Sequence, residues 1–371
     1  MLSPVITIAF IIGYFLILLL LGFITSRKAD DQSYFLGNKS SPWILVALGM
    51  IGDSLSGVTY ISVPGKVGVA QFSYLQIVLG YFAGYFIISR ILLPLYYRMN
   101  LTSIYEYLLS RFGIVTQRVG SLFFIISRLL GAAGRLYLAA NVIQFFVFDR
   151  IFETKIPFAL SVSVILFLML VYTYKGGIKT LVYTDTIQSL FLVAGVVLSI
   201  FAITGQLDIS LFDAAKVVTE SENSNFLFFD FLAPNFFFKD VIGGLFTAVA
   251  MTGLDQNMMQ KNLSCKSLSE AQKNITWFSI IMIVVNVFFL SLGVLLFHYC
   301  AVKNIQLPTD TETGKVLTDQ VFPTLALNHL GVFSGLVFIM GLTAATFSSA
   351  DSVLTTLTTS AYIYVMEINK N

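Results

Sequence analysis

The sequence contains few charged residues, few cysteines and few histidines. Charged residues make up 11% of the 371 residues and hydrophobic residues 57%, and the mean hydropathy is +0.84; these values lie far from those of a soluble domain. Two cysteines are too few for a disulfide framework. Two histidines without a Cys/His cluster do not indicate a zinc site, and the net charge of +2 does not suggest nucleic-acid binding. The composition predicts an integral membrane protein, and no enzyme signature is present.

Nine apolar runs are long enough to cross a lipid bilayer as helices. They cover approximately residues 4–24, 42–63, 71–97, 118–148, 156–174, 181–204, 240–260, 275–300 and 331–366. The first run has no basic segment before it and no small-residue cleavage site after it, so we interpret it as an uncleaved span and not as a signal peptide. We therefore expect an all-α, multi-pass protein of the cell membrane.

Basic residues gather in alternate connections between these runs. The groups are Arg27, Lys28 and Lys39; Arg98, Arg111 and Arg118; Lys175 and Lys179; and Lys261, Lys266 and Lys273. Acidic residues such as Glu153, Asp208 and Asp310 occur in the intervening connections. Because cytoplasmic loops are enriched in lysine and arginine, the basic connections are predicted to be cytoplasmic and the amino terminus to lie outside.

The second run combines glycines, hydroxyl side chains and a carboxylate. In "ILVALGMIGDSLSGVTYISVPGK" these are Gly49, Gly52, Asp53, Ser54, Ser56, Gly57, Thr59 and Ser62. Such a helix can unwind at mid-membrane, where free carbonyls and hydroxyls suit a small cation. The alternative is that the small residues serve close helix packing. The carboxylate favours an ion path, since intramembrane carboxylates are rare.

Asp351, Arg128 and Arg135 also lie within predicted spans, where a charged side chain is costly. Asp351 lies among hydroxyl residues in "TFSSADSV", where it either serves a cation site or is capped by hydroxyls or the cytoplasmic interface. Arg128 and Arg135 are seven residues apart and so share one helix face. They either face a pocket or belong to a structural ion-pair network.

Four segments together carry a resemblance to a known family. They are "LLPLYYRMNLTSIYEYLLSRFG", "YKGGIKTLVYTDTIQSLFL", "LDQNMMQKNLSCKSLSEAQ" and "FSSADSVLTTLTT". With them the chain resembles, over essentially its whole length, the sodium:solute symporter family of sodium-coupled sugar, proline and sialic acid carriers. The resemblance implies the leucine-transporter fold, an inverted repeat of five helices each with one extra helix in front.

This resemblance also implies a division of the chain. An extra helix and a cytoplasmic loop occupy residues 1–41, and the first repeat of five helices occupies 42–204. Segment 205–239 begins too polar to span and is expected to form an external helix and loop. Residues 240–371 hold three helices of the second repeat. Family members usually continue with further spans, so we expect this chain to be truncated.

Two sodium sites follow from the same resemblance. The common site is implied to use the backbone carbonyls of Gly52, Leu55 and Ala345 and the hydroxyls of Ser348 and Ser349. A second site is implied around Asp185, with Asp351 and Ser352 at positions where the family has hydroxyls. Two facing carboxylates would share a proton or hold a cation between them.

The solute pocket is implied beside the broken second run. Positions that match the sialic acid carriers are Ser54, Ser56, Thr59, Tyr74 and Arg128, whereas Val78 stands where those carriers have a glutamine. We add Asp53 and Arg135 from the residues themselves. A sugar, a sugar acid and an amino acid all remain open, and the arginines favour an anionic group.

These features predict a sodium-coupled symporter for a small polar solute, with sodium, the solute and the bilayer as its partners. The alternative is a non-transporting membrane sensor or interaction module that retains a transporter-like fold. A passive channel would need a continuous polar lining, whereas the polar residues here cluster at mid-membrane positions. A membrane enzyme lacks a nucleophile with a base partner.

Overall fold

The computed structural model describes residues 4–27, 31–101, 103–144, 148–149, 156–174 and 177–362. The first half contains α1 (Pro4–Ser26), α2 (Asp31–Leu36), η1 (Gly37–Lys39), α3 (Trp43–Ser54), α4 (Gly57–Ala70), α5 (Tyr74–Ile87), η2 (Ile88–Leu92), α6 (Leu93–Arg98), α7 (Tyr105–Phe112), α8 (Ile114–Ile143), α10 (Phe158–Thr173) and α11 (Gly177–Leu207). The second half contains α12 (Leu211–Glu220), η4 (Glu222–Ser224), α13 (Phe237–Ala248), η5 (Val249–Gly253), α14 (Gln256–Leu263), α15 (Leu268–Lys303), α16 (Thr318–Asn328) and α17 (Gly331–Ser360).

Each predicted apolar run coincides with a helix or with a bent pair of helices. Six helices among the described residues are long and apolar enough to cross a membrane, and two bent pairs raise that number to eight. The remaining run forms α10, a shorter apolar helix of 16 residues. Residues 363–366, the end of the ninth predicted run, lie outside the described residues.

Two of the spans are broken within their length. Helices α3 and α4 meet at an angle of 65°, and Leu55 between them has non-helical backbone angles. The unwinding predicted from the glycines and hydroxyls of this run is thus confirmed. A second break separates α13 and η5 from α14, again with a bend of 65°.

The second break corrects the sequence interpretation, which expected one continuous span over 240–260. Leu254 has non-helical backbone angles, and Asp255 follows in an extended conformation. The carboxylate of Asp255 then accepts a hydrogen bond from the backbone amide of Met258, 3.1 Å away. Asp255 therefore caps a new helix, because its side chain satisfies an amide that the break leaves free.

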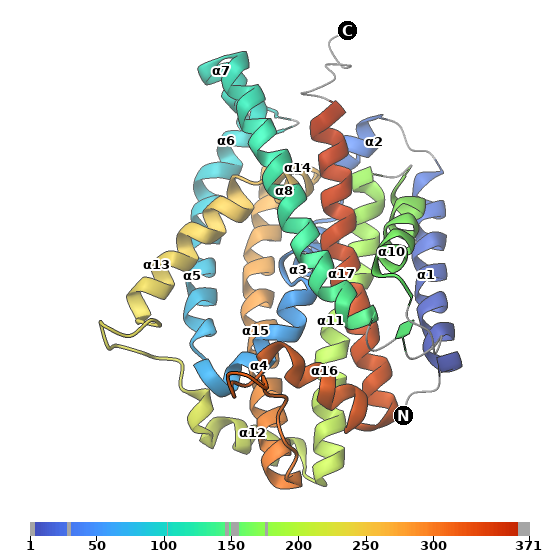
Figure 1. Cartoon of the computed structure of the whole chain (residues 1–371). Coiled ribbons are helices and arrows are strands. Elements are labelled where there is room, and N and C mark those ends of the chain that lie inside the picture. The colour runs from blue at the N-terminus through green and yellow to red at the C-terminus, as the bar shows by residue number, and fades with distance from the viewer. Residues whose placement is uncertain are drawn as a thin grey trace.

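The connections lie at two opposite ends of the molecule. Figure 1 shows α2 and α7 at one end and α12 and α16 at the other. This agrees with the alternation of basic and acidic connections in the sequence. Helix α12 lies within segment 205–239, and Ser210 and Asp213 form a capping box at its start. Lys28, Glu153 and Lys175 lie outside the described residues.

Lys261 departs from the predicted topology. The sequence interpretation placed it in a basic cytoplasmic connection, but it lies on α14 and its side chain is only 1% exposed. The neighbouring Lys266 is exposed, as expected of a loop residue. The bend before α14 turns Lys261 into the protein, where its charge meets acidic side chains.

The middle of the molecule is built from closely packed helices. Helix α11 packs against α3 and α17, and α5 packs against α13. In the second pair Gly80 lies against the backbone of Val241 and Gly244 against that of Ile77. Absence of side chains at these glycines permits the close approach. The packing brings both breaks to the centre, beside α8, α11 and α17.

Candidate functional site

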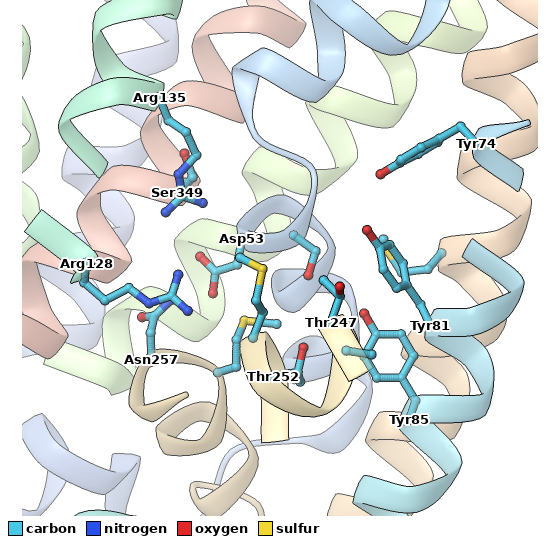
Figure 2. Close-up of a pocket in the computed structure, with 15 residues that line it drawn as sticks. Asp53, Tyr74, Tyr81, Tyr85, Arg128, Arg135, Thr247, Thr252, Asn257 and Ser349 are labelled. Carbon is cyan, nitrogen blue, oxygen red and sulfur yellow. The ribbon is translucent and has the colours of Figure 1, made fainter. Parts of the chain in front are cut away.

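A cavity of about 120 Å³ adjoins both helix breaks. Its walls come from α3, α5, α8, α13, η5, α14, α15 and α17. The lining residues are Asp53, Ser54, Tyr74, Tyr81, Tyr85, Arg128, Arg135, Thr247, Ala248, Met251, Thr252, Asn257, Met258, Met282 and Ser349. Figure 2 shows the two arginines on one side of the cavity, the three tyrosines on the opposite side, and Asp53 between them.

The cavity contains five of the seven predicted solute-binding residues. Asp53, Ser54, Tyr74, Arg128 and Arg135 line it, so the fold brings these residues together from distant parts of the chain. Ser56 and Thr59 are not among its lining residues; Ser56 is buried at the start of α4, and Thr59 is half-buried one turn later. Of the two halves of the broken span, α3 contributes residues to the cavity wall and α4 does not.

The sequence interpretation missed two tyrosines of the cavity wall. Tyr81 and Tyr85 follow Tyr74 at spacings of seven and eleven residues on α5 and line the same cavity. Such spacings return to one face of a helix, so this periodicity was available in the sequence. Val78, at the departure from the sialic acid carriers, is fully buried and does not line the cavity.

Arg128 is already paired with a protein carboxylate. Its guanidinium approaches one oxygen of Asp255 through two nitrogens, with distances of 2.6 and 2.5 Å. Asp255 is 3% exposed and also caps α14. The pair therefore ties α8 to the second helix break. This contact matches the ion-pair alternative for Arg128, although its side chain also reaches the cavity.

Arg135 is the arginine whose charge remains available. Its Nε donates to the carbonyl of Gly131 in the preceding turn, 3.2 Å away, and it forms no salt bridge with any residue that the structure describes. Its guanidinium borders the cavity. A free guanidinium in such a place suits a carboxylate, because it offers several donors in a planar array.

Gly52 and Ser348 bring α3 and α17 into direct contact. A side chain at Gly52 would collide with the hydroxyls of Ser348 and Ser189. The amide of Gly52 donates to the hydroxyl of Ser189 at 2.8 Å. The hydroxyl of Ser348 is buried and has no partner among the described residues. An unpartnered buried hydroxyl is costly, and a bound cation would satisfy it.

The other expected ligands of the common sodium site lie on the same two helices. Leu55 ends α3 at the break, and Ala345 lies one turn before Ser349 on α17; both are buried. The hydroxyl of Ser349 donates to the carbonyl of Thr346 at 3.2 Å and lines the cavity. Oxygen donors from a non-helical segment and a serine pair fit a weakly held monovalent ion.

Two of the residues expected at the second cation site, Asp185 and Ser352, contact a lysine. The ammonium of Lys261 contacts the carboxylates of Asp53 and Asp185. It also donates to the hydroxyl of Ser352 at 2.8 Å, and Ser352 in turn donates to Asp185 at 3.2 Å. Lys261 was missed as a site residue because its position in sequence resembles that of loop lysines.

Asp351 has a different partner. The hydroxyl of Tyr172 on α10 donates to one of its carboxylate oxygens at 2.5 Å, and Asp351 is fully buried. No hydrogen bond or ion pair joins Asp351 to Asp185 in the described part of the chain. The two carboxylates of the predicted pair thus have separate protein donors.

The family model of the sodium:solute symporter family matches residues 34–369. The chain belongs to this family. Its members are transporters and not enzymes, in agreement with the sequence interpretation.

Several members of the sodium:solute symporter family are similar in sequence. The sodium/sialic acid symporter SiaT of Proteus mirabilis is 24% identical over 359 residues, which cover 94% of this chain and 68% of that protein. The sodium-coupled monocarboxylate transporter 1 of Mus musculus is 27% identical over 345 residues, which cover 89% of this chain and 53% of that protein. The chain thus spans between about half and two thirds of the length of these relatives.

A solved structure of the family shows the fold. The substrate-bound, outward-open state of a Na⁺-coupled sialic acid symporter superposes with a TM-score of 0.85 and 22% identity, and the match covers 99% of this chain and 76% of that one. The all-α, leucine-transporter-like fold predicted from the sequence is confirmed.

Proposed function

We propose that the complete protein is a sodium-coupled symporter that imports a small anionic solute across the plasma or inner membrane. One observation carries this proposal: the residues of the ion site and of the cavity are consecutive in sequence. Gly52 precedes Asp53 and Ser54 of the cavity wall, and Ser348 precedes Ser349. An ion held between α3 and α17 would therefore fix the wall to which the solute binds.

This adjacency supplies a mechanism for coupling. Sodium bound by the carbonyls of Gly52, Leu55 and Ala345 and by the hydroxyls of Ser348 and Ser349 would hold the broken helix against α17. Its binding would favour the conformation in which the cavity is complete, and the two repeats would then move around it. One sodium ion that moves down about 100 mV supplies roughly 2.3 kcal/mol, or close to fiftyfold accumulation.

The cavity supports an anionic solute. Arg135 offers a guanidinium without a salt bridge to any described residue, while the tyrosines opposite offer hydroxyls and apolar ring faces. Sialic acid and monocarboxylates, the solutes in the names of two relatives, each contain a carboxylate. A sugar acid or a smaller carboxylate is therefore the favoured class of solute.

The test is uptake by the full-length protein in proteoliposomes. Radiolabelled sugar acids, monocarboxylates, neutral sugars and amino acids are compared with and without an inward sodium gradient, with potassium replacing sodium as the control. We expect sodium-dependent accumulation of a carboxylate and little accumulation of neutral solutes. Solute binding without uptake would favour the sensor alternative, and uptake indifferent to sodium would contradict the proposal.

A further inference from the structure

Lys261 is surrounded by oxygen atoms from three other helices. Asp53 comes from α3, Asp185 from α11 and Ser352 from α17, while Lys261 itself lies on α14. All four side chains are buried. A buried ammonium is stable only when acceptors replace its water, and this one has three acceptors for its three N–H groups.

These acceptors form the kind of site that a hard monovalent cation would occupy. Two carboxylates and one hydroxyl supply only oxygen, and the helices that carry Asp185 and Ser352 pack directly against each other. The side-chain nitrogen of Lys261 lies within contact distance of all three oxygens. A metal ion at that point would overlap the ammonium.

We infer that Lys261 is a built-in cation that fills this second site, so that the transporter couples its solute to one sodium ion and not to two. The inference rests on the proposed function and deepens it by setting the ion stoichiometry. The ammonium is covalently attached, so it cannot be released to the cytoplasm in each cycle. It neutralises Asp53 and Asp185 without contributing the energy of a second ion gradient.

Asp351 supports this inference through its separate contact. The two carboxylates have separate protein donors: Asp351 accepts from Tyr172 at 2.5 Å and from Gln188 at 3.5 Å, whereas Asp185 accepts from Lys261 and from Ser352. Each carboxylate also has a second oxygen without a partner in the described structure. The alternative is that a second sodium ion binds at those oxygens. The number of sodium ions bound per chain distinguishes this alternative from the inference.

The primary measurement is the number of sodium ions bound by the full-length protein in nanodiscs. Equilibrium binding of radioactive sodium should saturate at about one ion per chain, with a Hill coefficient of about one. Lys261→Ala removes the ammonium and leaves two carboxylates facing a small space. Because a cation would then be favoured there, the count should rise to about two.

Three variants control for other effects. Lys261→Arg keeps the charge and should remain at about one ion per chain. Lys261→Ala combined with Asp185→Asn removes one carboxylate and should return the count to about one. Lys266→Ala removes an exposed lysine five residues further along and should behave as the unaltered protein.

The outcomes distinguish this inference from the proposed function. A count of two in the unaltered protein would overturn the inference and leave sodium coupling intact, and this measurement does not depend on any variant folding. A count that stays at one in well-folded Lys261→Ala would also overturn it. Absence of sodium binding in the unaltered protein would instead contradict the proposed function.

Discussion

At the scale of single residues, the hydroxyl of Ser348 is the strongest support for the proposed ion site. It is buried at the contact between α3 and α17 and has no partner among the described residues. A hydroxyl buried in this way costs about 1–3 kcal/mol if nothing satisfies it. Its presence beside Gly52 is explained if a transported ion completes its coordination.

The first prediction concerns this hydroxyl. Ser348→Ala should weaken the apparent sodium affinity by about tenfold, since loss of one ligand costs roughly 1–2 kcal/mol. The measurement is the sodium concentration for half-maximal solute uptake. Ser334→Ala is the matched control, because Ser334 is also buried on α17 without a hydrogen-bond partner in the described residues. It lies about 21 Å away along the helix. Equal effects of the two substitutions would contradict the assigned site.

The second prediction separates the two arginines. Arg135→Ala should weaken solute binding by about a hundredfold or more, because it removes the cavity-facing guanidinium that has no paired carboxylate among the described residues. Sodium binding and thermal stability should change little. Solute binding by the purified full-length protein is the measurement. Normal solute binding in Arg135→Ala would show that the anionic group binds elsewhere.

Arg128 supplies the contrast to Arg135. Arg128→Ala leaves the buried carboxylate of Asp255 without its ion-pair partner, and loss of one member of a buried pair is strongly destabilising. We expect the thermal midpoint to fall by roughly 5 °C or more. Adding Asp255→Asn should recover much of the loss. No recovery in the double variant would indicate that Arg128 acts mainly through the solute.

At the scale of elements, the contact between α5 and α13 depends on glycines that face it. Gly244 lies so close to the carbonyl of Ile77 that an added methyl group would collide with backbone, which cannot move aside as a flexible side chain would. The adjacent Gly243 has no atom within 4 Å of such a methyl group. The two neighbours therefore differ in packing although they share the same helix.

The third prediction uses this difference. Gly244→Ala should destabilise the protein by about 1–3 kcal/mol through overpacking. Gly243→Ala should be neutral or stabilising by up to about 1 kcal/mol, because alanine favours the helix. Thermal unfolding of the detergent-solubilised protein, followed by fluorescence, measures both. A loss of stability in Gly243→Ala as large as that in Gly244→Ala would show that backbone flexibility matters more than the contact.

The two helix breaks act together at this scale. The first break places Asp53 and Ser54 on the cavity wall. The second places Asp255 in contact with Arg128 and directs the side chain of Lys261 into the protein interior. Both bends measure 65°. Free backbone groups and helix ends then meet beside the cavity, an arrangement that transporters use to bind ions and solutes.

At the scale of the whole molecule, the orientation in the membrane follows from the two ends of the helical bundle. Helix α7, with Arg111, lies at the end opposite to α12, with Lys216 (Figure 1). The basic connections predict that the α7 end faces the cytoplasm and the α12 end faces outward.

The fourth prediction tests that orientation. Cys265 and Cys300 are first replaced by serine, and Arg111→Cys and Lys216→Cys then introduce exposed thiols singly. A membrane-impermeant maleimide should label Lys216→Cys in intact cells and label Arg111→Cys only after permeabilisation. The reverse pattern would invert the proposed topology and the direction of transport.

The membrane class, the approximate spans and the first helix break were predictable from the amino-acid sequence alone. Long apolar runs must form helices in lipid because no other structure satisfies their backbone groups internally. The density of glycine and hydroxyl residues around Gly52 locally weakens the helix, so that break was visible without the fold. Ser348 and Ser349 were identified through their resemblance to a family motif, and the structure places Ser348 against Gly52.

Which buried charges meet depends on how the helices pack. Lys261 is separated in sequence by 208 residues from Asp53 and by 76 from Asp185, so no local pattern connects them. Its neighbours Lys266 and Lys273 make the segment resemble an ordinary basic loop. The bend at Asp255 carries Lys261 into the bundle, and close packing of α3, α11 and α17 brings the acceptors to it. A buried charge is stable only where its partners converge, and that convergence is a property of the packed helices rather than of any one segment.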